Sequence, residues 1–574
     1  MTAPHLAKSI AARRTWPLLV DAAALAAVLA LLYGVSALGR YWFGAVTPVA
    51  RISRSPAALP LYALFSLVRI ALAYVLSLAF ALAYGWIAAH SRRLETPMVA
   101  LLDILQSIPV LSFLPGVMLG MVSLFPTRQL GVELGAIVLI FTGQVWNLAF
   151  SFYTSLKAIP RELDEAAAVF RFGRWQRFFE LELPFGAIGL VWNSIVSVAG
   201  GWFFLMACEM FVLGRRDFRL PGLGSYLQTA ASAGDTPSIL WGLAAMIVVI
   251  VLLDQVVWRP LIAWSDRFKF EQVESAAAPR SPMLHVLRGS APARWVRRRV
   301  ALPVWERLTT PSAAASSPKP RVRTVPARAA AAVAGMGLAG VVIYALVEAA
   351  LVLRSLQAAE LLSTLKAAGA TFFRVMLSLI IASLWAVPAG VAIGFNRRIA
   401  HIAQPVAQIA ASVPATALFP VVLLVLIRFG GGMGVAAVLL MLLGTQWYVL
   451  FNVIAGAMAI PTELREVAGI FRFGGVQRWT TVILPGVFSY LVTGLVTASG
   501  GAWNASIIAE YFHFGGQTLT TTGLGAQISS ATDSGNPDLL LLSTIVMALM
   551  VVAINRLLWR PLYRLAETRF RLET

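Results

Sequence analysis

The residue types that carry out catalysis are few in this chain, and their spacing assembles no familiar reaction site. The five histidines are scattered, and the single cysteine, Cys208, lies inside an apolar run, so neither type has metal-ligand spacing. The dipeptide Gly-Lys does not occur, so the sequence lacks the phosphate-binding loop of a nucleotide hydrolase. Zinc-protease and serine-hydrolase motifs are missing as well. We therefore expect no enzyme activity, no metal site and no bound cofactor in this chain.

Two glutamates inside apolar runs are the ionisable residues of greatest interest. Each follows a glycine pair and a tryptophan, and Glu209 and Glu510 occupy matching places. An ionisable group at membrane depth is costly and therefore indicates a functional site, while adjacent glycines loosen a helix or allow close packing. A pathway or gating role and a structural role near the membrane interface both remain open for the two glutamates. The candidate pathway residues of these runs are Gly200, Gly201, Trp202, Glu209, Gly500, Gly501, Trp503, Asn504 and Glu510.

Long apolar segments dominate the chain and place it in a membrane. Hydrophobic residues make up 59% of the 574 residues, and charged residues only 13%. The runs are continuously apolar, whereas a membrane β-barrel alternates apolar and polar positions. Because a helix crosses the hydrocarbon core with about 20 apolar residues, we predict an all-α polytopic membrane protein with about 12 transmembrane helices. The spans are expected near residues 16–38, 62–90, 97–122, 133–157, 184–213, 237–263, 329–353, 368–396, 403–428, 434–457, 485–514 and 537–563.

The same sequence plan occurs twice, at an offset of about 300 residues. The run Phe170–Gly173 recurs as Phe471–Gly474, and Trp258–Pro260 recurs as Trp559–Pro561. Six spans per copy is an even number, so both copies enter the membrane from the same side and form a parallel repeat. The predicted domains are a first repeat at 1–263, a linker at 264–328 and a second repeat at 329–574.

The basic residues of the chain favour a membrane orientation rather than a nucleic-acid partner. The net charge is +20, and the stretch from Trp264 to Arg328 alone holds 13 Lys or Arg residues against 4 Asp or Glu residues. Basic residues flank spans on the cytoplasmic side, so we place the linker and both termini in the cytoplasm. No aromatic-bearing folded module accompanies these clusters, and we expect no nucleic acid to bind.

A polar loop after the fourth span of each copy carries the strongest motif. The loops run from Pro160 to Pro184 and from Pro461 to Pro485, with helical spacing and charges at both ends. Proline is tolerated in the first turn of a helix and stops a helix that would run through it. We therefore predict a short helix between two breaks in each loop, on the cytoplasmic face.

These loops resemble the cytoplasmic loop of the permease family of ABC importers, which carries a Glu-Ala-Ala motif, a glycine and a final Leu-Pro. The first copy reads Glu165-Ala166-Ala167 and ends at Pro184, and the second reads Glu466-Val467-Ala468 and ends at Pro485. The family glycine position is occupied by Arg171 and Arg472, and glycine comes two residues later in both copies. The resemblance implies helices that dock onto two copies of a separate ATPase, which uses ATP and Mg, with small alanines and the motif glutamates toward the partner. The implied coupling residues are Glu162, Glu165, Ala166, Ala167, Gly173, Pro184, Glu463, Glu466, Ala468, Gly474 and Pro485.

Within this family the chain is most similar to the duplicated permeases of the nitrate, sulfonate, taurine and bicarbonate branch, on the segments Gly200–Phe204 and Ala502–Glu510. The resemblance implies a type I importer fold in a bacterial inner membrane, uptake of a small anion and an extracytoplasmic substrate-binding protein. It also implies that the third spans line the conduit, although simple helix kinks are an equal alternative. The residues concerned are Ser107, Pro109, Ser412 and Pro414.

The main alternative is a secondary transporter with two parallel six-helix halves. Such a protein needs carboxylates near the membrane midplane and no ATPase. The twin cytoplasmic loops with Glu165 and Glu466 favour the importer.

Overall fold

The computed structural model describes residues 51–107, 109–126, 128–213, 216–268 and 358–569, with five isolated positions in between. The predicted span at 16–38 and nearly all of the predicted span at 329–353 and of the predicted linker lie outside the described residues. Contacts divide the chain into two compact units. Of the described residues, the smaller unit holds 154–191, 259–268 and 358–363, and the larger unit holds 51–153, 192–258 and 364–569.

Helices make up nearly all of the described part of the first copy. The elements are η1 (Pro56–Ala58), α2 (Leu59–His90), α3 (Glu95–Ser107), η2 (Val110–Phe113), α4 (Leu114–Leu124), α5 (Leu130–Lys157), α6 (Arg161–Val169), α7 (Arg174–Arg177), η3 (Phe178–Glu182), α8 (Leu183–Glu209), β1 (Val212–Leu213), β2 (Arg216–Asp217), α9 (Leu223–Ser232), α10 (Thr236–Leu253), η4 (Asp254–Trp258), α11 (Arg259–Ser265) and η5 (Asp266–Phe268).

The second copy repeats this order. Its elements are α16 (Ala358–Phe395), α17 (Arg397–Ser412), α18 (Ala415–Arg428), α19 (Met433–Ala459), α20 (Thr462–Ile470), α21 (Gly475–Arg478), η8 (Trp479–Ile483), α22 (Leu484–Ala509), β3 (Tyr511–Phe514), β4 (Gln517–Thr520), α23 (Leu524–Ser534), α24 (Pro537–Ile554), η9 (Asn555–Trp559) and α25 (Arg560–Arg569). The residues at several helix starts are those that favour the beginning of a helix. For example, Asp235 and Asn536 cap α10 and α24 by accepting backbone N–H groups at 3.2 Å, and a proline occupies the first turn of each helix.

The predicted all-α membrane fold is confirmed for the described residues. Eight continuous helical segments are long and apolar enough to cross a membrane, and each overlaps a predicted span. They are Pro56–His90, Leu130–Lys157, Arg174–Glu209, Thr236–Ser265, Ala358–Phe395, Met433–Ala459, Gly475–Ala509 and Pro537–Ala566.

The third span of each copy is broken at the proline where the sequence predicted a kink or an unwound turn, within the predicted spans at 97–122 and 403–428. In the second copy α17 and α18 meet at an angle of 86°, and Pro414 precedes α18 with an extended backbone. In the first copy Pro109 stands before η2 in the same way, between α3 and α4. Because the residue before a proline avoids the helical conformation, each proline ends one helix and allows the next to start in a new direction.

Pro184 and Pro485 do not break their helices, contrary to the prediction. Each follows a π-helical turn, in which Leu183 N donates to Phe178 O and Leu484 N donates to Trp479 O. The wider turn shifts the hydrogen-bond pattern just before the proline, so the missing proline N–H leaves the helix continuous. The polar loop is therefore a short helix followed by a second helix that extends directly into the fifth span.

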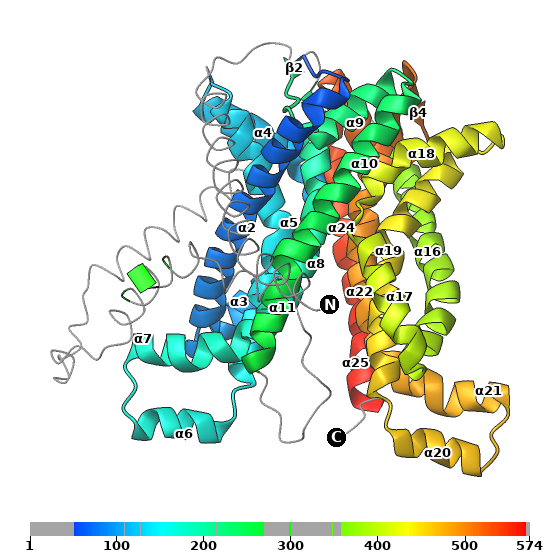
Figure 1. The fold of residues 1–574 in the computed structure, drawn as a ribbon. Coiled ribbons are helices and arrows are strands. Elements are labelled where there is room, and N and C mark those ends of the chain that lie inside the picture. The colour runs from blue at the N-terminus through cyan, green and yellow to red at the C-terminus, as the bar shows by residue number, and fades with distance from the viewer. Residues whose placement is uncertain are drawn as a thin grey trace, which may run out of the picture. The chain divides into compact units, whose positions relative to one another are not determined.

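The fifth spans end at Glu209 and Ala509, several residues before the predicted ends at 213 and 514. Short antiparallel hairpins follow, β1 with β2 and β3 with β4. In the second hairpin the turn residues Gly515 and Gly516 have positive φ angles of 57° and 76°, which glycine adopts without strain. Within the larger unit this hairpin lies at one end of α22, and α20 and α21 lie at the other end (Figure 1).

Candidate functional site

The predicted coupling segments are two helix–turn–helix units with the same backbone geometry. Pro160 and Pro461 precede α6 and α20 with extended backbones, which starts each helix without a proline N–H. Each helix ends in a turn in which Phe172 N donates to Ala167 O at 2.9 Å, or Phe473 N donates to Ala468 O at 3.0 Å. This is the hydrogen bond of a Schellman motif, which requires a left-handed residue just before the donor.

Arginine occupies that left-handed position in both copies. Arg171 has φ 52° and Arg472 has φ 50°, and they are the only non-glycine residues with positive φ in the described part of the chain. The left-handed conformation costs a non-glycine residue about 1–2 kcal/mol. Gly173 and Gly474 have φ angles of −65° and −62°, so they do not replace the left-handed residue. This chain therefore forms the same turn with arginine at the left-handed position that glycine usually occupies.

The turns between the paired helices present large apolar side chains to solvent. The exposed fractions are 74% for Phe170 and 70% for Phe471, and the other members are similarly exposed. Contiguous exposed apolar residues indicate a surface that a partner covers. We call these sets the first tip (Val169, Phe170 and Trp175) and the second tip (Ile470, Phe471 and Val476). Sequence reasoning missed them, although apolar residues within a polar loop were a usable signal.

The predicted coupling residues divide into exposed and buried sets. The alanines Ala167 and Ala468 are buried within the chain, so the expectation that they face a partner was wrong, and Ala166 is half-buried. Pro184 and Pro485 are also half-buried within the continuous helices. The exposed predicted residues are Glu162, Glu165, Gly173, Glu463, Glu466 and Gly474.

Two of the predicted pathway residues, Asn504 and Gly200, lie where the two copies meet. Asn504 accepts a hydrogen bond from Leu111 N at 3.3 Å, just after Pro109. A Cβ on Gly200 would lie 4.0 Å from the Tyr448 hydroxyl, and a Cβ on Gly501 would lie 3.5 Å from the same ring. Tyr448 of the second copy is thus close to a glycine from each copy.

Gly201 and Ser412 contact residues of their own copy. A Cβ on Gly201 would collide with the side chain of Gln144, and the Ser412 hydroxyl donates to Gln408 O at 2.8 Å. Trp202 and Trp503 are 2% and 1% exposed. Pro414 is buried, a Cβ on Gly500 would meet nothing within 4 Å, and Ser107 ends α3.

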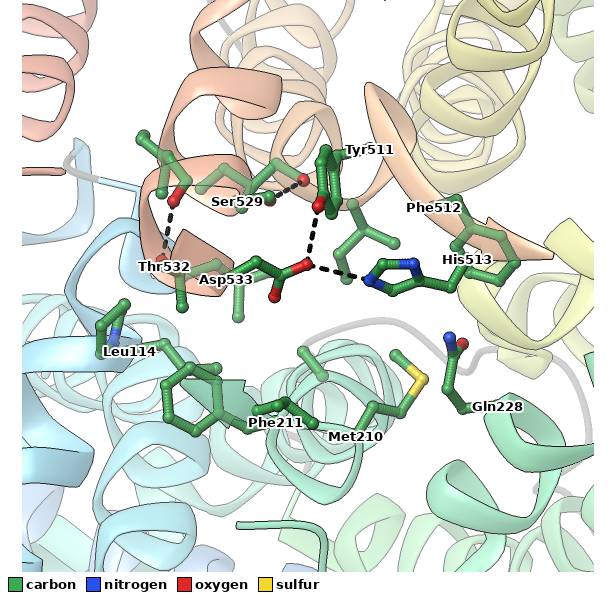
Figure 2. Close-up of a pocket in the computed structure, with 17 residues that line it drawn as sticks. Leu114, Met210, Phe211, Gln228, Tyr511, Phe512, His513, Ser529, Thr532 and Asp533 are labelled. Carbon is green, nitrogen blue, oxygen red and sulfur yellow. Dashed lines mark hydrogen bonds and ion pairs between the residues drawn. The ribbon is translucent and has the colours of Figure 1, made fainter. Parts of the chain in front are cut away.

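A pocket lies between the two copies, beyond the ends of α8 and α22, with a volume of about 150 Å³ (Figure 2). Its first-copy wall contains Met210, Phe211 and Gln228, and its second-copy wall contains Tyr511, His513 and Asp533. The Tyr511 hydroxyl donates to Asp533 Oδ2 at 2.6 Å, and His513 Nε2 lies 2.9 Å from the same oxygen. Sequence reasoning did not find this pocket, because its walls come from segments far apart in the chain.

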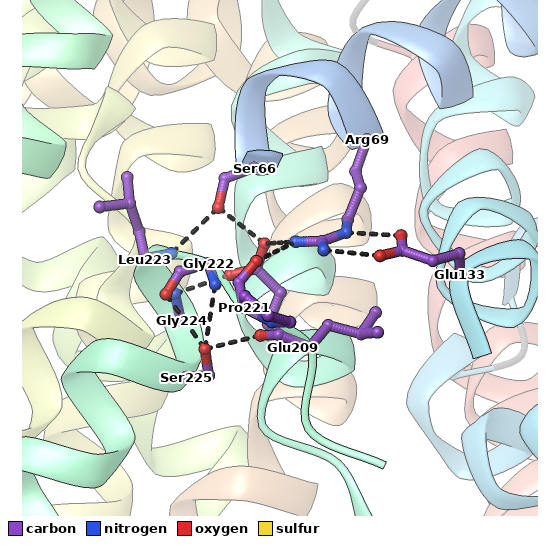
Figure 3. Close-up of polar contacts among 10 residues, drawn as sticks. Ser66, Arg69, Glu133, Glu209, Pro221, Gly222, Leu223, Gly224 and Ser225 are labelled. Atoms are coloured by element: carbon purple, nitrogen blue, oxygen red, sulfur yellow. Dashed lines mark hydrogen bonds and ion pairs between the residues drawn. The ribbon is translucent and has the colours of Figure 1, made fainter. Parts of the chain in front are cut away.

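Glu209 lies in a buried cluster of charged side chains at the end of α8 (Figure 3). Arg69 of α2 donates to Glu133 from Nε and Nη2, both at 2.7 Å, and to Glu209 Oε1 from Nη1 at 2.8 Å. Ser66 and the backbone N–H of Gly224 complete the hydrogen bonds to Glu209. The three charged side chains are fully buried. The cluster therefore joins α2 to α5, to the end of α8 and to the first turn of α9.

Glu510 occupies the corresponding cluster of the second copy. Arg374 Nη1 donates to Glu510 Oε1 at 2.7 Å, and Thr371 and the backbone N–H of Gly525 also donate to this carboxylate. A Cβ on Gly222 or Gly523 would collide with Glu209 or Glu510, which explains a glycine at each place. Sequence reasoning found both glutamates but not their arginine partners.

No group of three or more His, Cys, Asp or Glu side chains that could hold a metal ion occurs among the described residues. Cys208 is buried and has a free thiol. The arrangement offers ion pairs, apolar tips and a pocket between the copies.

Together the duplicated helices, the broken third spans and the twin tips define a polytopic membrane permease with two copies of one transport unit. The chain belongs to the family of binding-protein-dependent transport system inner membrane components, which it matches over residues 81–257 and again over 386–571. The matches fall inside the two predicted repeats, whose boundaries at 263 and 329 remain predictions. The chain is thus a duplicated permease of the ABC transporter class.

Individual relatives are permeases for small solutes. The chain is 26% identical to the nitrate import permease protein NrtB of Leptolyngbya laminosa, over 33% of this chain and 64% of the relative. It is 29% identical to the taurine transport system permease protein TauC of Escherichia coli, over 32% of this chain and 62% of the relative. It is 28% identical to the bicarbonate transport system permease protein CmpB of Synechococcus elongatus, over 25% of this chain and 49% of the relative. The chain therefore spans less than two thirds of the length of these relatives.

Proposed function

We propose that this chain carries both halves of the membrane channel of an ATP-driven importer for a small anion of the nitrate, sulfonate, taurine or bicarbonate kind. The two copies form one conduit, and two copies of a separate ATPase, which uses ATP and Mg, dock onto α6 and α20. An extracytoplasmic binding protein delivers the solute. The termini, the linker and both tips lie on the cytoplasmic side of a bacterial inner membrane.

The twin tips carry this proposal. Two segments about 300 residues apart present the same strained turn, with Arg171 or Arg472 in the left-handed position and with phenylalanine exposed beside it. An isolated strained turn costs free energy and exposed aromatic side chains promote aggregation, so their occurrence in both copies supports a docked partner. The exposed glutamates of α6 and α20 supply charges that can pair with basic groups of the ATPase.

The relatives support the substrate class. Permeases named for nitrate, taurine and bicarbonate transport each match part of the chain at 26–29% identity. These solutes share a small size and an anionic group.

Affinity purification of the tagged full-length chain from its native membrane tests the partner. We expect an ATPase subunit to copurify with the wild-type chain. The double substitution Phe170→Asp with Phe471→Asp should reduce its recovery at least tenfold, because a charge on each tip must be desolvated on docking.

The matched control is Phe429→Asp. Phe429 is 84% exposed and follows α18, so it lies at the end of α19 opposite α20. This substitution should leave the recovery of the ATPase unchanged. Equal recovery from the wild-type chain and the double variant would refute docking through the tips.

A further inference from the structure

The pocket between the copies has one apolar wall and one polar wall (Figure 2). Met210, Phe211 and Val212 of the first copy occupy the places that Tyr511, Phe512 and His513 occupy in the second copy. The two copies therefore contribute different chemistry to one cavity. Its volume of about 150 Å³ far exceeds the ~15 Å³ that a single water needs, so a small organic molecule fits.

The hydrogen-bond donors on the polar wall are already used. The Tyr511 hydroxyl donates to Asp533, the Ser529 hydroxyl donates to Ile507 O, and the Thr532 hydroxyl donates to Ile528 O. Both ring nitrogens of His513 are engaged, Nε2 with Asp533 Oδ2 and Nδ1 with Thr518 Oγ1 at 2.9 Å each. A ligand that only accepts hydrogen bonds therefore finds few donors in this wall.

Acceptors remain open on both walls. Asp533 Oδ2 takes both hydrogen bonds from Tyr511 and His513, and the other carboxylate oxygen points toward the opposite wall (Figure 2). Across the pocket, Gln228 Oε1 is buried and has no hydrogen-bond partner among the described residues. A buried acceptor without a donor is costly, so the site is suited to a ligand that supplies N–H groups.

The charges of the pocket agree with this pattern. None of its 17 lining residues is Lys or Arg, and Asp533 is its one carboxylate. The His513 imidazole is the one lining group that can carry a positive charge, and Asp533 already engages it, whereas an ammonium group would pair with the open oxygen of the Asp533 carboxylate. The remaining surface is mostly Leu, Ile, Met and Phe, which suits a short carbon chain.

We propose that the pocket binds the protonated amine of a small organic solute, with Asp533 as counter-ion and Gln228 Oε1 as a second acceptor. This proposal rests on the proposed import function and narrows its substrate class to amine-bearing anions, such as an aminosulfonate. Nitrate and bicarbonate lack the amine and gain nothing from Asp533. Tyr511 and His513 act as positioning residues, since both contact Asp533 Oδ2 and so fix the orientation of the carboxylate.

Binding to the purified full-length chain in lipid nanodiscs tests the proposal without any ATPase. The probes are 2-aminoethanesulfonate, ethanesulfonate and nitrate, compared by ligand-observed nuclear magnetic resonance. We expect the wild-type chain to bind 2-aminoethanesulfonate at least tenfold more tightly than ethanesulfonate or nitrate. Asp533→Asn should weaken 2-aminoethanesulfonate binding about tenfold and leave ethanesulfonate binding unchanged.

Two further variants keep the test decisive. Asp538→Asn changes an exposed carboxylate in the first turn of α24, outside the pocket, and should have no effect. Gln228→Leu removes the acceptor on the opposite wall without disturbing the contacts of Asp533, and should weaken 2-aminoethanesulfonate binding about threefold. If the Asp533→Asn variant does not fold, the Gln228→Leu variant tests amine binding in the pocket by itself.

Equal affinities of the wild-type chain for 2-aminoethanesulfonate and ethanesulfonate would overturn the proposal. So would unchanged 2-aminoethanesulfonate binding in both pocket variants. These results leave the import function intact if ATP-driven uptake of ethanesulfonate persists. Amine binding without any ATP-driven uptake would instead refute the import function while the pocket assignment stands.

Discussion

The buried charge clusters of the two copies occupy the same place but contain different charges. In the first copy Arg69 pairs with two carboxylates, Glu133 and Glu209, and all three side chains are fully buried. In the second copy Arg374 is 14% exposed, and Glu510 is its one carboxylate partner among the described residues. The place of Glu133 is taken by Gly434, where a Cβ would lie 3.9 Å from Arg374 Nε. The Thr521 hydroxyl accepts a hydrogen bond from Arg374 Nη2 instead, at 2.9 Å.

This comparison shows that the two copies can differ in the charges of a buried contact and still connect the same helices. Both clusters fix the end of the fifth span to the second helix of the copy and to the first turn of α9 or α23. In the first copy the joint depends on a dry triad of charges, whereas in the second copy a hydroxyl replaces one charge. A dry cluster depends strongly on every member, because removing one leaves a buried charge uncompensated. We therefore expect unequal responses to matched substitutions.

The largest expected effect comes from removing the arginines. Arg69→Met leaves two buried carboxylates without their cation and should destabilise the chain by about 3–5 kcal/mol. Arg374→Met leaves one carboxylate that Thr371 and Gly525 still contact, and should cost about half as much. Thermal unfolding of the purified chain in detergent measures both. Equal losses would contradict the contrast between the copies.

Exchanging the residues that differ sharpens the comparison. Glu133→Gln removes a charge from the double hydrogen bond with Arg69 and should cost about 2 kcal/mol. Gly434→Glu adds the missing carboxylate beside Arg374, where no atom stands closer than 3.7 Å to the new Cβ, and should change stability by less than about 1 kcal/mol. Chemical denaturation of the two variants provides the measurement. A larger loss for Gly434→Glu than for Glu133→Gln would reverse the expected order.

The left-handed turns beside the two tips, by contrast, should respond alike. Arg171→Gly and Arg472→Gly relieve the left-handed strain and should each stabilise the isolated chain by about 1 kcal/mol. Gly474→Ala serves as the control, because its φ of −62° suits alanine and a Cβ would meet nothing within 4 Å. Melting temperatures of the single variants test this. A lower melting temperature for both arginine variants would show that the side chains stabilise the turn.

The smallest expected effect is a pH dependence in one hairpin. The hydrogen bond to Asp533 raises the pKa of the His513 imidazole above its ordinary value, and burial raises the pKa of the neighbouring Tyr511, which stays protonated. The protonated imidazole therefore stabilises the β3–β4 hairpin fully below a pH of about 6.5, and this contribution is lost as the pH rises through the higher folded pKa.

Hydrogen exchange at Gly515 and Gly516 measures this effect, because their N–H groups donate to Ala231 O and Ser232 O of the first copy. We expect their protection to fall between a pH of about 6 and a pH of about 8, after correction for intrinsic exchange. His513→Gln should abolish the dependence. The β1–β2 hairpin has Val212 at the matching place and supplies the internal control. A pH dependence that survives His513→Gln would exclude the imidazole as its source.

The sequence predicted much of the fold because hydrophobic length and repetition are local properties. The spans followed from runs of apolar residues, and the bends at Pro109 and Pro414 followed from the chemistry of proline. Pro184 misled the prediction, because a π-helical turn accommodates a proline and no rule of residue types foresees that turn. The prediction extended the fifth spans past Glu209 and Ala509 because apolar residues also build the hairpins.

The candidate site was harder to predict because its contacts join distant segments. Glu209 was found from its type alone, but Arg69 is separated from it by 140 residues, and only the fold brings them together. Arg171 was recognised as standing in the place of a glycine, yet its left-handed backbone is visible only in three dimensions. The pocket at Asp533 needs walls from both copies, which no single stretch of sequence reveals.

The central claim is that ATP hydrolysed by a separate partner drives solute through this chain by way of α6, α20 and the two tips. ATP-driven uptake into proteoliposomes containing the chain, its copurified ATPase and the binding protein tests it most directly. We predict that the double variant Glu165→Arg with Glu466→Arg inserts normally but loses at least nine tenths of the uptake, while the wild-type chain requires ATP. Uptake that continues without ATP or ATPase, driven by an ion gradient, would contradict the account.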